Sequence, residues 1–281
     1  MQFTQQQSTV LKEIEEYQSR LPDLRYHRPH QSVSTGPLLP GCAICVRSGY
    51  LSFQLGFACN AHCPFCFLET HPPHEIDEDE EYHRRAQLKR FERQVDRVEG
   101  VALTGGEPLL YLSELERVVT QMRAANEKLY FWIYSNGIIA DREHLGVVRD
   151  LGIQEIRFNL AATDWRPKAL GNVELAREMI EHVAVEVPSY PPQKAALLAI
   201  LPELERIGIE QLNLQELWVT PANAIKLSGE SYQAGVLFTK KYFLYGSRRM
   251  TYEVMAHCME KGYSFTVNDC TASEFGRSQQ E

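Results

Sequence analysis

Three cysteines stand close together at Cys59, Cys63 and Cys66, in the spacing C-x3-C-x2-C. Cysteine thiolates hold iron–sulfur clusters, and a [4Fe–4S] cluster normally takes four of them. Three thiolates from one loop leave one iron with an open coordination position, which is what catalysis at a metal needs. The spacing therefore suits a catalytic iron–sulfur site.

A second cysteine pair leaves zinc as an alternative to iron. Cys42 and Cys45 precede the loop as C-x2-C, and Cys63 and Cys66 repeat that spacing within it. Two such pairs are typical of four-cysteine zinc sites, so spacing alone does not separate zinc from iron. The chain has 7 cysteines, an odd number, and we interpret them as metal ligands or catalytic thiols rather than as disulfides.

The elements that must position these cysteines form a repeating pattern. Short apolar strands are expected at 50–57, 101–103, 129–134, 153–160, 183–187 and 209–219. Helical segments lie between them, and strands that alternate with helices in this way indicate βα units and a parallel sheet. We expect Pro188 to end the fifth strand, residues 22–41 to be irregular, and the acidic run 75–81 to begin a helix in solvent.

Two further motifs also follow predicted strands. Residues 104–108 read Thr-Gly-Gly-Glu-Pro, and residues 135–137 read Ser-Asn-Gly. The carboxyl ends of parallel strands lie at one edge of the sheet, where ligands of such sheets and barrels bind. Glycines there allow the backbone to approach a ligand closely. The cysteine loop and both motifs are therefore expected to share one site.

Over roughly residues 50–218, these motifs resemble the radical S-adenosylmethionine (radical SAM) superfamily. The resemblance implies an α/β fold with a partial (β/α)6 barrel at 50–218. Residues 1–49 would be an N-terminal helical arm with the C-x2-C pair, and residues 219–281 a C-terminal α+β extension. In its compact size the chain is similar to the glycyl-radical activating enzymes. With its C-x2-C pair ahead of the cluster loop it resembles uncharacterised relatives of the pyruvate formate-lyase and other glycyl-radical activating enzymes.

The resemblance also implies roles for individual residues. Cys59, Cys63 and Cys66 would each ligate one iron, and SAM would chelate the fourth. Further contacts to SAM are implied for Phe65, Gly105, Gly106, Glu107, Ser135, Asn159 and Pro188. The implied activity is that of an oxidoreductase that cleaves SAM to a 5′-deoxyadenosyl radical, which abstracts a substrate hydrogen. Its electron would come from a flavodoxin or ferredoxin.

The remaining cysteines suggest a second site. Cys42 and Cys45 lie before the first strand and Cys270 lies in the tail, and these segments of a partial barrel can meet. We expect an auxiliary iron–sulfur cluster or zinc there. Cys258 is a possible fourth ligand, although its place in a predicted helix among apolar residues is also typical of a buried free cysteine.

The reaction itself is left open by the sequence. The substrate is a small molecule or a protein, and the polar residues Asn213, Gln215 and Glu216 on the last strand are candidate contacts because buried polar groups need partners. A second possibility is sulfur or methylthio insertion that uses the auxiliary cluster. A third is a zinc or iron–sulfur protein with a structural or electron-transfer role and no catalysis.

Composition bounds the partners and the compartment. The formal net charge of −8 argues against nucleic acid, which usually binds a basic face. No run of eighteen apolar residues predicts a membrane span, and residues 1–10 lack the layout of a signal peptide. We therefore expect a cytoplasmic protein without a membrane partner.

Overall fold

A computed structural model describes residues 5–27, 32–73, 79–234 and 242–270 of the chain. Its helices are α1 (Gln5–Arg20), α2 (Pro40–Val46), α3 (Asp79–Glu92), α4 (Leu112–Ala125), α5 (Arg142–Asp150), α6 (Pro167–Met179), α7 (Lys194–Ile207), α8 (Pro221–Ala224) and α9 (Ser247–Lys261). Short 3-10 helices are η1 (Val95–Arg97), η2 (Pro108–Leu110), η3 (Leu160–Thr163) and η4 (Pro191–Gln193). Among the helices of these residues, none is long and apolar enough to cross a membrane.

The strands form one large sheet and one small one. They are β1 (Arg25–His27), β2 (Ser32–Ser34), β3 (Tyr50–Gln54), β4 (Gly100–Thr104), β5 (Tyr130–Ser135), β6 (Glu155–Phe158), β7 (His182–Ser189), β8 (Gln211–Glu216), β9 (Trp218–Val219), β10 (Tyr232–Ala234), β11 (Tyr242–Leu244) and β12 (Thr266–Asp269). In the described residues the large sheet has the order β1-β2-β12-β8-β7-β6-β5-β4-β3, and β10-β11-β9 form the small one.

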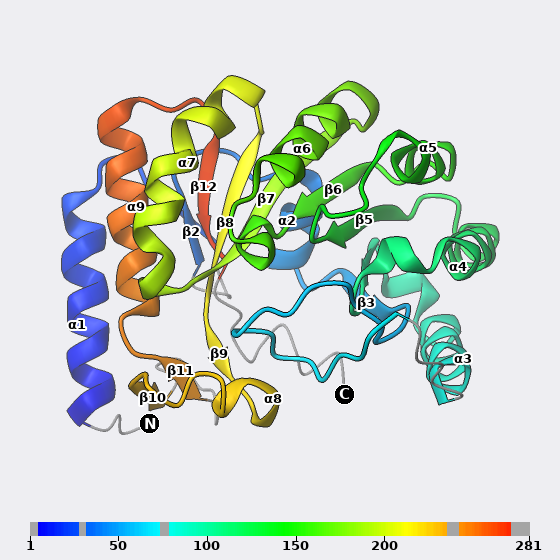
Figure 1. The fold of residues 1–281 in the computed structure, drawn as a ribbon, viewed down its shortest axis with the longest axis horizontal. Helices are drawn as coiled ribbons and strands as arrows, with labels where there is room; N and C mark the ends of the chain where they lie inside the picture. The colour runs from blue at the N-terminus through cyan, green and yellow to red at the C-terminus, as the bar shows by residue number, and fades with distance from the viewer. Residues whose placement is uncertain (1–4, 28–31, 74–78, 235–241, 271–281) are drawn as a thin grey trace.

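Strands β3 to β8 are parallel and lie side by side in chain order (Figure 1). A helix crosses between each successive pair, as right-handed βα connections require. The predicted α/β class with six parallel strands is thus confirmed.

Both ends of the chain add to this sheet. β12 pairs parallel with β8, β2 pairs antiparallel with β12, and β1 pairs antiparallel with β2. Residues 22–41, expected to be irregular, therefore hold two strands. These strands are too short to be read from local pattern; β2 forms on the edge that β12 presents, and β1 in turn pairs with β2.

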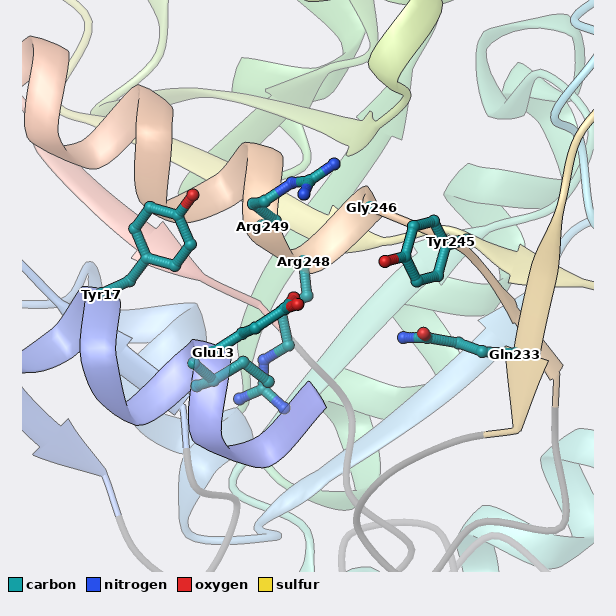
Figure 2. A pocket seen from close by; sticks show the side chains of 8 residues that line it. Glu13, Tyr17, Gln233, Tyr245, Gly246, Arg248 and Arg249 are labelled. Carbon is teal, nitrogen blue, oxygen red and sulfur yellow. The ribbon is translucent and has the colours of Figure 1, made fainter. Parts of the chain in front are cut away.

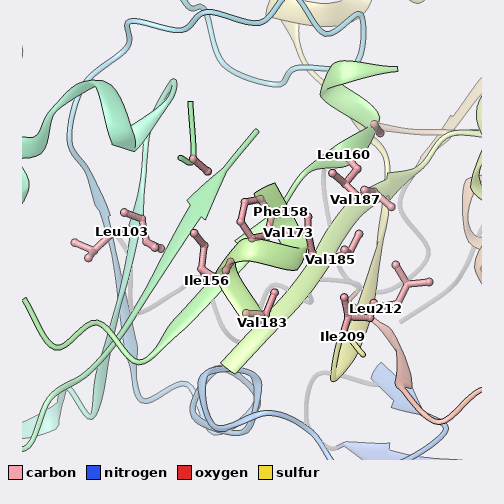
Figure 3. Packing of buried hydrophobic residues seen from close by; sticks show 14 of the residues in the cluster. Leu103, Ile156, Phe158, Leu160, Val173, Val183, Val185, Val187, Ile209 and Leu212 are labelled. Atoms are coloured by element: carbon pink, nitrogen blue, oxygen red, sulfur yellow. The ribbon is translucent and has the colours of Figure 1, made fainter. Parts of the chain in front are cut away.

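The two faces of the sheet differ in polarity. On the face toward α4–α7 the strands place apolar side chains, which pack with residues such as Val173 of α6 (Figure 3). On the other face, the alternate residues of the same strands are polar and yet buried: Glu155, Arg157, Glu186, Gln211 and Asn213. Successive strand residues point to opposite faces, so one chain builds both surfaces. We call the polar side the inner face.

Pro188 does not end the fifth predicted strand. β7 continues through Pro188 to Ser189, paired with β8. β6 pairs with β7 only as far as Val185. Beyond that residue, the side of β7 that would face β6 is an unpaired edge. Proline is tolerated at such an edge because no ladder hydrogen bond is lost there.

Candidate active site at the cysteine loop

The cysteine loop leaves the carboxyl end of β3 and is closed at its base by backbone hydrogen bonds. Cys59 N–H donates to the carbonyl oxygen of His71 at 2.9 Å, and His71 N–H donates to that of Phe57 at 3.2 Å. Inside the loop, Cys66 N–H donates to the carbonyl oxygen of Cys63 at 3.3 Å. The three motif cysteines therefore lie on one short, closed segment.

A buried carboxylate holds the chain just before the loop. Glu80 Oε1 accepts hydrogen bonds from Phe57 N–H at 2.6 Å and from the hydroxyl of Tyr111 at 2.8 Å. The same hydroxyl accepts from Ala58 N–H at 2.7 Å. The acidic run was expected in solvent, but Glu80 is buried. Its partners come from distant parts of the chain, so local sequence does not reveal them.

The turn after β4 packs against the same stretch of backbone. Gly106 N–H donates to the carbonyl oxygen of Gly56 at 2.9 Å, and Glu107 N–H donates to that of Ala58 at 2.8 Å. Gly105 has φ +143°, and a Cβ there would overlap the carbonyl oxygen of Gly56. A Cβ on Gly106 would overlap that of Ala58. Both glycines are therefore needed for this close approach.

Glu107 links the ends of β4 and β5. Its side chain is fully buried, and it accepts hydrogen bonds from Leu109 N–H at 3.2 Å and from Asn136 N–H at 2.7 Å. The Ser135 side chain also hydrogen-bonds to it. Burial nevertheless raises the pKa of Glu107 to about 7. A cationic ligand beside it would favour the charged form.

Asn136 is a site residue for which the sequence predicted no individual role. Its Nδ2 donates to Asn60 Oδ1 at 2.7 Å and lies 3.8 Å from Cys59 Sγ. It is the middle residue of the Ser-Asn-Gly motif, and that motif's place at a strand end was the only local sign of its role.

The other residues implied to contact SAM lie around this edge. Asn159 donates its N–H to the carbonyl oxygen of Ser135 at 2.8 Å, and its side chain caps η3. Phe65 is buried, with its ring edge-on to Tyr190 at 5.9 Å between centroids. Pro188 lies in β7, two residues before that tyrosine.

The three thiols fit an iron–sulfur cluster by their chemistry. Burial raises the pKa of Cys59, and burial together with Cys66 and Cys59 raises that of Cys63 to about 12. Cys59 Sγ already accepts a hydrogen bond from Ala61 N–H at 3.4 Å, and such N–H···S contacts stabilise bound thiolates. Within the described part of the chain, no three His, Cys, Asp or Glu side chains are placed to hold a single metal ion.

The candidate substrate residues of β8 fall on two faces. Asn213 Nδ2 and Gln215 Nε2 donate to the Glu186 carboxylate at 2.9 and 2.5 Å, on the inner face. Glu216 directly follows Gln215 in β8 and faces the opposite side of the sheet, where the charge of Arg248 acts on its carboxyl group. Burial raises the pKa of Glu216 to about 7. The period-two alternation of a strand prevents all three from facing one site.

The four cysteines outside the loop do not all lie together. Cys42 and Cys45 lie on α2 and Cys270 directly follows β12; Cys45 raises the pKa of Cys42, and both raise the pKa of Cys270. Cys258 is buried in α9, and its pKa is raised by burial and by Glu205, not by another cysteine. The structure therefore does not bring Cys258 to the other three.

A small pocket lies elsewhere, where α1 and α9 meet the small sheet (Figure 2). Glu13 and Tyr17 of α1 line it together with Gln233, Arg248 and Arg249. Its cavity of about 10 Å³ is close to the minimum for one water molecule, so it is too small for an organic substrate.

Residues 53–185, which include the cysteine loop, the Gly105–Glu107 turn and Asn136, match the family model of the radical SAM superfamily. Over these residues, just under half of the chain, the protein is similar to that superfamily. A Methanocaldococcus jannaschii protein named as a candidate glycyl-radical enzyme activating enzyme is 24% identical over 204 residues, which are 68% of this chain. The chain spans 53% of that relative, about half its length.

Solved structures of two other proteins share the fold. Streptococcus suis SuiB bound to its precursor peptide SuiA aligns with a TM-score of 0.56 and 14% identity, over 92% of this chain and 61% of SuiB. The native anSMEcpe structure with AdoMet and the Kp18Cys peptide aligns with a TM-score of 0.53 and 14% identity, over 78% of this chain and 63% of that one. At such identities the likeness is one of fold alone.

Proposed function

We propose that this protein is a radical SAM enzyme that holds a [4Fe–4S] cluster on Cys59, Cys63 and Cys66 and cleaves SAM reductively. The observation that carries the proposal is the hydrogen bond from Glu107 N–H to the carbonyl oxygen of Ala58 at 2.8 Å. It joins the glycine turn to the cysteine loop at the carboxyl ends of parallel strands, where ligands of such folds bind.

Each part of the edge has a task in this proposal. A cluster bound there would supply the electron that breaks the C5′–S bond of SAM. Glu107 would hold the amine of the SAM methionine, and its raised pKa would fall toward ordinary values beside that positive charge. Phe65 and Asn159 would border the nucleoside, and buried apolar neighbours would exclude water.

The substrate we propose is a protein or peptide. Support comes from the name of the M. jannaschii relative, which assigns it to the activation of glycyl-radical enzymes, and from SuiB, which was crystallised with a precursor peptide. A flavodoxin or ferredoxin would deliver the electron.

The test is 5′-deoxyadenosine formation. The chain, reconstituted anaerobically with iron and sulfide, is mixed with dithionite and SAM, and the product is measured by mass spectrometry. We expect the wild type and Cys258→Ala to form it and Cys63→Ala to form at least about a hundredfold less, since that variant loses a cluster ligand. A wild-type chain that binds iron but forms no 5′-deoxyadenosine would instead support a structural or electron-transfer role.

A further inference from the structure

A second group of cysteines gathers on the inner face of the sheet. Cys42 and Cys45 are three residues apart on α2, so they lie on the same side of that helix. The helix is fixed to the sheet, because Gly41 N–H donates to Glu155 Oε2 at 3.0 Å. A Cβ on Gly41 would come within 2.7 Å of Arg157 Nη2, so α2 packs as closely as a helix can.

The register of β12 brings the third cysteine to the same face. Asn268 Nδ2 donates to Asn213 Oδ1 at 2.9 Å, which places its side chain on the inner face. Cys270 N–H donates to the carbonyl oxygen of Leu214 at 2.9 Å, so the chain continues along β8. Residues two apart in an extended chain point the same way, so Cys270 also faces inward.

Cys42 meets this same set of side chains. Gln211 Nε2 donates a hydrogen bond to Cys42 Sγ at 3.0 Å, and Cys42 Sγ lies 3.6 Å from Asn213 Oδ1. Asn213 is thus the neighbour of Cys42 on one side and of Asn268 on the other. Both Cys42 and Cys45 raise the pKa of Cys270, which places the three thiols within electrostatic reach of one another.

One nitrogen atom of a buried cationic side chain near these thiols has no hydrogen-bond acceptor. Arg157 is 2% exposed, and its Nη2 atom has no hydrogen-bond partner. Its other nitrogens donate to Glu155 at 2.6 Å, Glu186 at 3.0 Å and Tyr134 at 3.2 Å. Unpaired buried donors are costly, so the free N–H points to an acceptor that belongs to a bound group.

We propose that Cys42, Cys45 and Cys270 ligate a second iron–sulfur cluster. Its sulfur atoms would accept the free N–H of Arg157. Gln211 would keep its N–H···S hydrogen bond to Cys42, a contact that tunes bound clusters.

Zinc and an iron–sulfur cluster make different demands on three thiols. A tetrahedral zinc with Zn–S bonds of about 2.3 Å needs its sulfur ligands about 3.8 Å apart, around one point. Ligands of a cluster bind different irons and stand farther apart.

The experiment compares iron, sulfide and zinc in four anaerobically reconstituted full-length chains. They are the wild type, Cys59→Ala/Cys63→Ala/Cys66→Ala, Cys42→Ser/Cys45→Ser, and Cys258→Ala as the matched control. Circular dichroism establishes that each is folded, and the electron paramagnetic resonance spectrum of the reduced protein identifies each cluster. The triple variant should keep between about a third and a half of the wild-type iron, with a cluster signal of its own. The Cys42→Ser/Cys45→Ser variant should keep the other part of the wild-type iron, and Cys258→Ala should keep all of the wild-type iron.

The outcomes also separate this proposal from the proposed function. A triple variant without iron, beside a wild type with one cluster, overturns the second site and leaves SAM cleavage standing. Stoichiometric zinc in the triple variant overturns it as well. A wild type without any iron contradicts both proposals. If Cys42→Ser/Cys45→Ser fails to fold, Arg157→Lys in the triple-variant background provides a second readout. We expect it to shift the signal of the remaining cluster. An unchanged spectrum contradicts the site.

Discussion

The backbone N–H of Asn136 donates a 2.7 Å hydrogen bond to Oε2 of Glu107, and this contact joins the ends of β5 and β4. The Asn136 side chain extends the connection to Asn60 in the cysteine loop. Three strand ends are therefore held together through one amide residue and one buried carboxylate. The loop that carries the candidate cluster ligands is positioned by backbone contacts of its neighbours, not by its own residues alone.

Glu107→Gln is expected to weaken SAM binding at least about tenfold. Glutamine lacks the negative charge that would attract the SAM ammonium, and a hydrogen bond to a charged group contributes about 1.5–3 kcal/mol. The dissociation constant, measured by equilibrium dialysis with the reconstituted chain, checks this. Glu116→Gln is the control, because that side chain is exposed on α4. Equal affinities in the two variants would show that Glu107 does not contact SAM.

Tyr111→Phe is expected to lower the free energy of unfolding by about 1–3 kcal/mol. The variant loses the hydroxyl that accepts from Ala58 N–H and donates to Glu80, and it leaves both groups buried without that partner. Urea denaturation of the metal-free chain measures the change. Tyr82→Phe, at a ring that is 71% exposed, should change stability by less than about 0.5 kcal/mol. A Tyr111 variant as stable as this control would contradict the role of the hydroxyl.

Gly106→Ala is expected to destabilise the chain by about 1–3 kcal/mol, because the added Cβ would overlap the carbonyl oxygen of Ala58 and force two backbone segments apart. The matched change is Gly171→Ala, inside α6, where a Cβ meets no atom within 4 Å. That variant should gain about 0.5–1 kcal/mol, since alanine is the better helix former. Thermal unfolding of both measures the contrast, and changes of the same sign would refute it.

Glu216→Gln is expected to change the pH dependence of stability. Burial raises the pKa of Glu216 to about 7 in the folded chain, above its usual 4.5. Folding therefore favours the protonated form, and this contribution is complete below about pH 4.5 and is lost as the pH rises through about 7. The stability of the wild type relative to the variant should fall over that window, by up to about 3 kcal/mol.

Urea denaturation of the metal-free wild type and variant at pH 5, 6, 7 and 8 gives this difference directly. Glu107 also has a raised pKa, but both proteins share it, so its contribution cancels. Exposed Glu116→Gln should show a difference from the wild type that does not vary with pH. A Glu216→Gln difference that is equally flat would mean that this carboxyl titrates normally.

The sequence by itself predicted the class of chemistry and determined the edge of the sheet where the motifs gather. The spacing of Cys59, Cys63 and Cys66, and a glycine turn after the next strand, can be read without coordinates because both are local. Strand ends of a parallel sheet must share one edge, so the joint position of these motifs followed from the predicted order of strands and helices alone.

Only the tertiary structure decided which side chains hold that edge together. Glu80 was expected in solvent and is buried against Tyr111, and Cys42 raises the pKa of Cys270, from the other end of the chain. Such contacts join segments far apart in sequence, and no periodicity encodes their register. The pairing of β12 with β8 sets that register, and it also determines which cysteines face inward and that Cys258 does not join them.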